Sequence, residues 1–224
     1  MYVYWLEGSA SELPVSDDWL TAGERERLAS LRFPKRRADW RLGRWTAKRA
    51  VAIYLELPSL EAVEIRAAPS GAPEAFVAGE RAPLALSISH RRSVAVCAIG
   101  VGAMSIGCDL ELIEPRSDAF VADYFTAEEQ GLIAREPEMA NVVWSAKESA
   151  LKAMGEGLRL DTRCVVVHCG IAAGDVGWRP LRVRRTGGET LDGWWQSDGE
   201  FVRTMVASPP PQPPVLFVVS PFVR

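Results

Sequence analysis

The sequence predicts an α+β fold of two similar α/β halves, residues 1–100 and 101–224. The first observation is the order of segments, because strand, helices and strands follow one another twice along the chain. The second is the length, since 224 residues suffice for two small domains of roughly 100 residues each. The third is a hydrophobic fraction of 48%, which is ordinary for a globular protein. The halves share no visible sequence identity, so the predicted duplication rests on the order of elements.

The elements of the first half follow from local patterns. We expect a strand at 1–7, a short helix at 21–31, a long helix at 34–55, and strands at 63–67, 84–89 and 93–99. Pro34 suits the first turn of the long helix and Pro58 ends it. Residues 68–83 are rich in glycine, alanine and proline, so we expect a loop there.

The second half begins with a strand around Asp109. Thr126 followed by Glu129 is a capping-box pattern and opens a helix, and a further helix begins near Asn141 and stops at Gly155 and Gly157. The remainder predicts strands at 164–169, 181–185, 194–196, 201–207 and 215–219. The proline-rich run 208–214 cannot join a sheet ladder and predicts an extended connector.

Composition and charge indicate which partners and which cellular compartment to expect for this protein. The chain has 26 Lys and Arg against 29 Asp and Glu, a net charge of −3, which argues against a nucleic-acid or membrane specialist. Glu7 interrupts the N-terminal apolar run before it could act as a signal peptide, and no apolar stretch approaches the ~18 residues of a membrane helix. The four cysteines lack the paired spacing of zinc or redox sites, so we expect reduced thiols and a cytoplasmic protein.

Two short motifs present acidic side chains on rigid elements. Strand residues alternate between faces, so Asp109 and Glu111 point the same way, while Glu148 and Lys152 lie one turn apart on one helix face. Three carboxylates and an ammonium group suit a divalent cation and a phosphate. Each pair taken alone is more often a solvated strand edge or a surface ion pair worth ~0.3–0.5 kcal/mol.

The start of the long helix is strongly basic. Eight Lys and Arg residues stand between positions 32 and 49 against the single acid Asp39. Arg37, Arg41, Arg44 and Lys48 fall on one helical face, which would suit several phosphates. The alternative is a solvated helix surface, and a nucleic-acid grip is disfavoured because the charge is confined to one segment.

Two other candidate sites fail on geometry. Ser89 and His90 are adjacent on a strand and face opposite ways, so they cannot form a nucleophile–base pair; His90 could instead donate to a phosphate oxygen. Cys164, His168 and Cys169 lie close in sequence, but the last two diverge within a strand, leaving no tetrahedral zinc set.

Taken in order, these motifs resemble the 4'-phosphopantetheinyl transferase superfamily, specifically the larger monomeric type that activates carrier proteins of peptide and polyketide synthetases. The resemblance covers nearly the full length. It rests on a basic helix containing Gly43-Arg44 and on the segments 87–90, 106–111, 125–129 and 144–148, followed by Lys152.

The resemblance implies a pseudo-duplicated fold with the active site in the cleft between the halves. The implied reaction moves the 4'-phosphopantetheine arm of coenzyme A to a serine of an apo acyl, peptidyl or aryl carrier protein. It requires Mg²⁺, releases adenosine 3',5'-bisphosphate and serves secondary-metabolite biosynthesis. The enzyme would act as a cytoplasmic monomer.

The resemblance also assigns roles to residues of this chain. The implied catalytic residues are Glu148, as the base, Lys152, on the phosphates, and Asp109. The implied Mg²⁺ ligands are Asp109, Glu111 and Glu148. The implied coenzyme contacts, in addition to Asp109 and Lys152, are Ser89, His90, Arg36 and Arg44, with Arg27 a looser match.

Two positions depart from the family pattern. Gly71-Ala72-Pro73 stands where a basic residue often lies between glycine and proline, so that contact is absent or is supplied by Arg81 or an arginine of the long helix. Cys108 replaces a branched aliphatic residue, and we expect no functional effect because its side chain faces away from the metal.

Alternative functions stay open at this point. The same acids could serve a Mg²⁺-dependent phosphodiester or pyrophosphate hydrolase with water as the acceptor. The basic segment 32–49 could belong to a non-enzymatic module that binds an anionic partner. The segment 112–125 is where the resemblance places carrier recognition, although Phe120, Val121, Tyr124 and Phe125 could equally form core.

Overall fold

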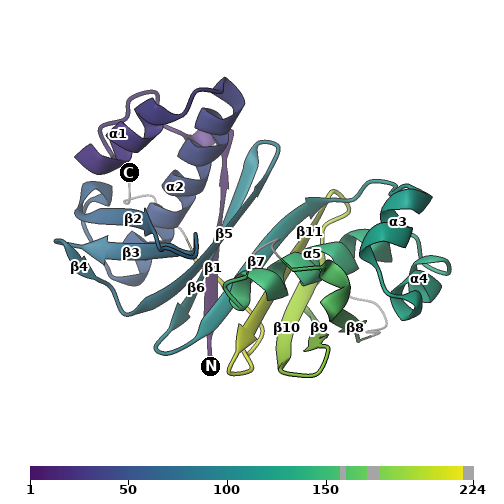
Figure 1. Ribbon diagram of the computed structural model, residues 1–224. Helices are drawn as coiled ribbons and strands as arrows, with labels where there is room; N and C mark the ends of the chain where they lie inside the picture. The colour runs from purple at the N-terminus through teal and green to yellow at the C-terminus, as the bar shows by residue number, and fades with distance from the viewer. Residues whose placement is uncertain (157–159, 171–176, 219–224) are drawn as a thin grey trace.

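A computed structural model describes residues 1–156, 160–170 and 177–218 and shows a mixed α+β fold, which confirms the predicted class (Figure 1). The purple-to-blue N-terminal elements gather on one side of the molecule and the green-to-yellow elements on the other. Each group has its own sheet with a long helix packed on it. The duplication of the halves remains a prediction.

The first half holds a mixed four-stranded sheet and a small three-stranded one. Their orders are β12-β1-β6-β5 and β2-β3-β4. The elements are β1 (Val3–Ser9), α1 (Ala22–Ser30), α2 (Pro34–Tyr54), β2 (Val63–Ala67), β3 (Pro73–Val77), β4 (Glu80–Arg81), β5 (Leu84–Arg91) and β6 (Val94–Val101).

The expected loop at 68–83 is wrong, because it contains β3 and β4. These strands form a hairpin across Ala78 and Gly79, whose φ angles of 52° and 85° are left-handed. The composition pointed to a loop since the turn residues dominate it. Pairing of Val63 with Val77 nevertheless fixes a strand there.

The second half holds an antiparallel sheet of order β7-β11-β10-β9-β8. The elements are β7 (Ser105–Leu112), α3 (Asp118–Tyr124), α4 (Ala127–Ile133), α5 (Met139–Ala153), β8 (Val165–Cys169), β9 (Arg179–Arg185), β10 (Thr190–Ser197) and β11 (Phe201–Ser208). The capping box of Thr126 and Glu129 is confirmed. Helix α3 was not expected from the sequence, and Gly157 lies outside the described residues.

The C-terminal segment returns to the first half. After the predicted connector, β12 (Val215–Leu216) pairs in parallel with β1, and the Phe217 ring stacks on Tyr4 with centroids 5.5 Å apart. The predicted strand 215–219 is therefore short, and its last residue lies outside the described part. The division of the chain at residue 100 remains a prediction. The predicted division assigned residues 215–219 to the second half, whereas β12 joins the sheet of the first half.

A separate hydrophobic core joins the two halves. It is formed by β1 and β6 against β7 and β11, with Trp5, Val96, Cys108 and Met205 among its members. Next to it β5 and β7 lie side by side without a regular ladder, and the Cys108 amide donates to Ser87 Oγ at 2.9 Å. This pairing brings the middle of β7 against a strand of the first half.

Helix α5 lies unusually close to β7. A Cβ on Gly107 would overlap the Ser149 carbonyl oxygen and come within 2.7 Å of the Ala153 amide nitrogen. Glycine is therefore required at this position. The close approach sets the distance between the acidic strand and the helix that carries Glu148.

Each half contains the same buried connection between a capping box and a lysine. In the first half, Glu24 caps with Thr21, accepts from the Ile65 amide at 3.0 Å, and pairs with the fully buried Lys48. In the second half the residues in the same roles are Thr126, Glu129, Val167 and Lys147, and the ion pair is 2.9 Å. We call these the first and second latches.

No helix in the described part of the chain is long and apolar enough to cross a membrane. All four cysteines are free.

Candidate functional site

Strands β5 and β7 and helix α5 bring four of the predicted site residues together. Lys152 Nζ donates to Asp109 Oδ1 at 2.8 Å and to Ser89 Oγ at 3.2 Å. Ser89 Oγ itself donates to Asp109 Oδ1 at 2.8 Å. Glu148 Oε2 lies 4.0 Å from the same ammonium nitrogen. The first half thus supplies the serine, and the second half supplies both carboxylates and the lysine.

Asp109 has one occupied and one unoccupied oxygen. The residue is 3% exposed, and its Oδ2 is buried but accepts no hydrogen bond from the described residues. A buried carboxylate oxygen without a donor is costly unless a partner arrives. This oxygen is therefore suited to a cation.

Glu148 is held partly protonated near neutral pH. Burial raises its pKa to about 7, together with the negative charges of Asp109 and Glu111, while Lys152 opposes the rise. A carboxylate with a pKa near 7 accepts a proton more readily than an ordinary glutamate. The strand–helix arrangement thus produces a candidate general base.

Lys152 stays charged despite its surroundings. Burial lowers the pKa of its ammonium group, but the carboxylate of Asp109 and further negative groups outweigh that effect, so the net pKa is raised. Its third hydrogen bond goes to the Cys108 carbonyl oxygen at 3.0 Å. The ammonium group is fixed in place and bears a full positive charge.

Glu111 points to the same side as Asp109 but has partners that the sequence did not suggest. Its Oε2 accepts from Arg116 at 3.1 Å and lies 3.5 Å from Arg91 Nε. Burial and Asp109 raise the pKa of Glu111, and the two arginines work against this rise. In this structure guanidinium groups balance the charge of the carboxylate.

The acidic cluster suits a divalent cation without forming a finished ligand set. Among the described residues no three His, Cys, Asp or Glu side chains are already placed to hold a metal ion. The charge of Asp109 nevertheless raises the pKa of Glu111, and the charges of Asp109 and Glu111 raise the pKa of Glu148, while Asp109 Oδ2 lacks a donor. Hard carboxylate oxygens with this shared negative charge fit Mg²⁺.

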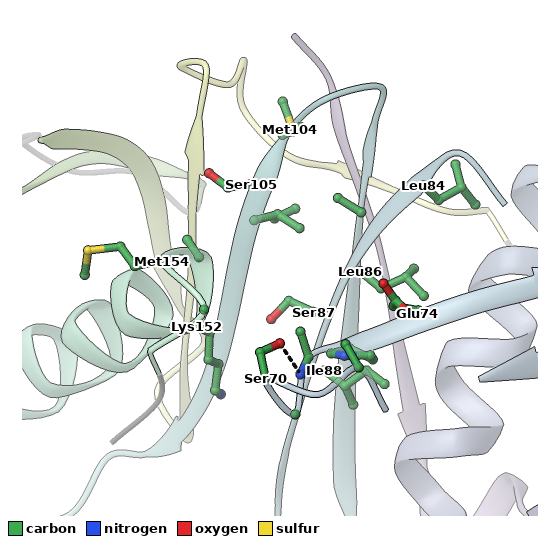
Figure 2. A pocket seen from close by; sticks show the side chains of 18 of the residues that line it. Ser70, Glu74, Leu84, Leu86, Ser87, Ile88, Met104, Ser105, Lys152 and Met154 are labelled. Carbon is green, nitrogen blue, oxygen red and sulfur yellow. Dashed lines mark hydrogen bonds between the residues drawn. The ribbon is translucent and has the colours of Figure 1, made fainter. Parts of the chain in front are cut away.

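A cavity of about 540 Å³ opens between the halves next to Lys152. Figure 2 shows Lys152 and Met154 on one side of it and Leu84, Leu86 and Glu74 on the other. Its volume is in the ~300–1,000 Å³ range of small-molecule sites. Of the predicted site residues only Lys152 lines it, so the carboxylates lie beyond the lysine at its edge.

One of the two departures from the family pattern, at residues 71–73, lies in the wall of the same cavity. Gly71, Ala72 and Pro73 form part of its wall together with Arg81. The Arg81 side chain is 64% exposed and pairs with Glu74 at 2.9 Å. Arg81 and Ala72 thus lie in the wall of the same cavity.

The predicted basic contacts fall into two further hollows on the first half. Arg36 and His90 line one, and Arg27 and Arg44 line the other, with Trp40 common to both. His90 therefore faces α2, whereas Ser89 faces Asp109, as strand alternation predicted. The Arg44 guanidinium lies over Trp40 at 5.0 Å, and burial lowers its pKa.

The long helix was predicted to carry a basic face, formed by Arg37, Arg41, Arg44 and Lys48, that binds phosphates or faces solvent. This prediction is wrong for three of the four residues. Lys48 is fully buried against Glu24, and Arg41 donates to Asp17 and to the Pro14 carbonyl. Arg37 donates to the Leu28 carbonyl oxygen. Three of the four stripe residues thus pack the helix against neighbouring segments, and only Arg44 lines a hollow.

The segment after β7 divides between core and surface. Phe125 is buried, Phe120 and Val121 are partly buried, and Tyr124 is 40% exposed. Phe120 and Tyr124 contact Trp144 with ring centroids 5.0 and 5.2 Å apart. Carrier recognition by this segment remains a prediction.

Sequence reasoning missed the arginines that contact the acidic cluster. Arg91 ends β5, and Arg116 follows β7 by four residues; neither belongs to the two motifs that predicted the acidic cluster. The sequence does contain one indication of this contact. Arg116 stands only seven residues after Asp109, so the chain that leaves the acidic strand could bring its guanidinium back to the carboxylates.

Comparison with known proteins gives one positive result. The family model of the 4'-phosphopantetheinyl transferase superfamily matches residues 105–175, which include β7, α5 and the acidic cluster. A search of curated proteins found no match.

Proposed function

We propose that this chain, whose residues 105–175 match the family model of the 4'-phosphopantetheinyl transferase superfamily, transfers the 4'-phosphopantetheine arm of coenzyme A to a serine of an apo carrier protein. The second product is adenosine 3',5'-bisphosphate. We further propose that it is of the larger monomeric type and serves carrier domains of secondary-metabolite synthetases. The observation that carries the proposal is the cluster of Ser89, Asp109, Glu148 and Lys152 at the edge of the cavity between the halves.

In the proposed reaction Glu148 takes the proton of the carrier serine hydroxyl. The serine oxygen bonds to the β-phosphorus of coenzyme A, while the bond from that phosphorus to the bridging oxygen breaks and the bridging oxygen leaves on adenosine 3',5'-bisphosphate. A base with a pKa of about 7 suits proton removal near neutral pH. Lys152, fixed and charged, stabilises negative charge on the pyrophosphate.

The acidic cluster would hold the cation that this family typically requires. Asp109, through its donor-free Oδ2, Glu111 and Glu148 are the side chains that would bind Mg²⁺. Bound there, Mg²⁺ would offset charge on the pyrophosphate oxygens. The chain itself contributes orientation, since Ser89 and Lys152 fix Asp109 from two sides.

Basic side chains of the first half, in two further hollows and in the cavity wall, would bind the nucleotide end of the coenzyme. Arg36 and His90 form one candidate phosphate contact, and Arg27 and Arg44 form another. Arg81 supplies the contact that Ala72 cannot make. Separate cationic groups are what a ligand with a pyrophosphate and a 3'-phosphate needs.

The direct test is intact-mass spectrometry of an apo carrier protein incubated with the protein, coenzyme A and Mg²⁺, with and without EDTA. We expect the carrier to gain one phosphopantetheine arm only when the divalent cation is present. No gain on fatty-acid, polyketide and peptide-synthetase carriers would contradict the proposal. Release of adenosine 3',5'-bisphosphate without any carrier would support a hydrolase instead.

Glu148→Gln tests the base. The variant keeps the shape of the side chain but cannot accept the serine proton, so we expect transfer to fall by ~10²-fold or more with folding retained. Glu136→Gln, at an exposed position of the same half, is the matched control and should transfer normally. Near-normal turnover of Glu148→Gln would remove Glu148 from the mechanism.

A further inference from the structure

The carboxylate of Glu111 is held from outside its own strand. Its side chain is 13% exposed, and its Oε2 contacts Arg116 Nη2 and Arg91 Nε. Its Oε1 makes no hydrogen bond with the described residues. One oxygen is thus fixed by guanidinium groups, and the other stays available.

Arg116 reaches three different elements through one guanidinium group. Nε donates to Asn141 Oδ1 at 2.9 Å, Nη2 donates to Glu111, and Nη1 lies 3.4 Å from Glu114 Oε1. The group also lies over the Phe120 ring at 5.1 Å. Arg116 therefore joins β7, the segment after it and the first turn of α5.

The anchor of this connection is itself rigid. Asn141 is 1% exposed, and its Nδ2 donates to the Glu114 carbonyl oxygen at 3.0 Å. The amide thus uses both its acceptor and a donor on the segment after β7. A planar guanidinium presents donors from separate nitrogens in a fixed fork, one towards Asn141 and one towards Glu111, whereas a lysine offers all its donors from a single nitrogen on a flexible stem.

We propose that Arg116 is a positioning residue that holds Glu111 Oε2, so that Glu111 Oε1 is presented to the cation site shared with Asp109 and Glu148. This inference rests on the proposed function, in which these carboxylates bind the metal. Partners that orient metal-ligating side chains commonly change metal affinity by ~10–100-fold when removed. Arg116 would act through Glu111 and would not itself touch the coenzyme.

The test measures Mn²⁺ binding by electron paramagnetic resonance, with and without coenzyme A and in the absence of a carrier. We expect Arg116→Ala to weaken Mn²⁺ binding by ~10-fold or more and Arg116→Lys to restore little of it. Arg135→Ala removes an exposed arginine of the same half and should bind Mn²⁺ as the native chain does. Millimolar guanidinium should restore Mn²⁺ affinity to Arg116→Ala, which a loss of folding stability alone would not allow.

A double-mutant cycle with Glu111→Gln separates positioning from general electrostatics. If Arg116 acts through Glu111, Arg116→Ala should weaken Mn²⁺ binding little further once Glu111→Gln is present. If Arg116→Ala fails to fold, Asn141→Ala keeps the guanidinium but removes its anchor and should weaken Mn²⁺ binding several-fold.

Two results would overturn the inference. Unchanged Mn²⁺ affinity in Arg116→Ala with only a lower melting temperature would make the residue structural. A higher affinity would mean that the guanidinium competes with the cation. If either result is found while the native chain still transfers the arm normally, the proposed function stands and only the role of Arg116 is rejected. If Arg116→Ala weakens Mn²⁺ binding but the native chain modifies no carrier, the role of Arg116 stands and only the proposed function is rejected.

Discussion

Glu148 has its pKa raised by burial and by the negative charges of the acidic cluster. It is 18% exposed, and burial and the two neighbouring carboxylates raise its pKa to about 7, against an ordinary value of 4.5. The folded state therefore binds this proton more tightly than the unfolded chain does. Stability contributed by the protonated form is complete below about pH 4.5 and is lost as the pH rises towards 7.

Glu148→Gln should remove this pH dependence. In EDTA, the free energy of unfolding of the variant relative to the native chain should increase between pH 5 and pH 8 by on the order of 1–3 kcal/mol, since one pKa unit corresponds to about 1.4 kcal/mol. Urea denaturation at the two pH values measures it. A constant difference across that range would contradict the raised pKa of Glu148. Glu136→Gln, at an exposed position, is the control.

Single-residue geometry was predictable where strand or helix periodicity decides it. Alternation along β5 separated Ser89 from His90, and alternation along β7 put Asp109 beside Glu111. The arginine partners of Glu111 were not predictable, because Arg91 comes from the other half of the chain and Arg116 from an irregular segment. Periodicity contains no information about such contacts.

Between elements, the second latch holds α5 to α4 and β8. The Lys147 ammonium is fully buried and donates to the Thr162 and Val165 carbonyl oxygens as well as pairing with Glu129. Glu129 in turn accepts from the Val167 amide at 2.9 Å. Because Lys147 precedes Glu148, this latch fixes the rotation of α5 that turns Glu148 towards Asp109.

Lys147→Met should destabilise the protein by ~3–5 kcal/mol, because it leaves Glu129 charged and buried without its cation. Adding Glu129→Gln should recover part of that loss. Lys35→Met is the control, since Lys35 is 85% exposed in its pair with Asp39 and such pairs contribute ~0–1 kcal/mol. Urea denaturation compares the variants, and a loss for Lys147→Met no larger than the control's would contradict the latch.

The capping box of the second latch was predictable from the sequence because it is local. Thr126 and Glu129 are three residues apart and cap their helix as predicted. The buried lysines were not readable, since a charged residue on a helix usually faces water. Lys48 was therefore assigned to an exposed stripe, whereas the long-range pairing with Glu24 decides its place.

For the whole molecule, the two halves are joined by more than the chain between them. The shared core of β1, β6, β7 and β11 is accompanied by the ion pair between Arg203 and Glu7 at 2.5 Å. The C-terminal segment adds β12 and Phe217 to the first half. The fold class was predictable from the order of segments, but this return was not, because a two-residue strand carries almost no sequence signal. The two latches repeat one arrangement of residues in both halves, and the duplication of the halves stays a prediction.

Phe217→Ala should destabilise the first half although it changes a residue near the C-terminal end of the described chain. Loss of the stacking on Tyr4 and the edge contact with Tyr54, at 6.5 Å between centroids, should cost ~1–3 kcal/mol. Hydrogen exchange should accelerate at amides of β1 and α2. Val218→Ala, at a side chain 90% exposed, is the control; faster exchange confined to α5 would contradict this assignment.

The return of β12 to β1 also has a consequence for biosynthesis. A ribosome makes β1 before β12, the strand that covers its outer edge, and before Phe217, which stacks on Tyr4 of β1; among the described elements β12 comes last. Until then the nascent chain exposes an unpaired edge with Tyr2 and Tyr4 beside it. Such edges and late long-range pairings slow folding and invite association with other chains. The half that is synthesised first is thus the half that is finished last.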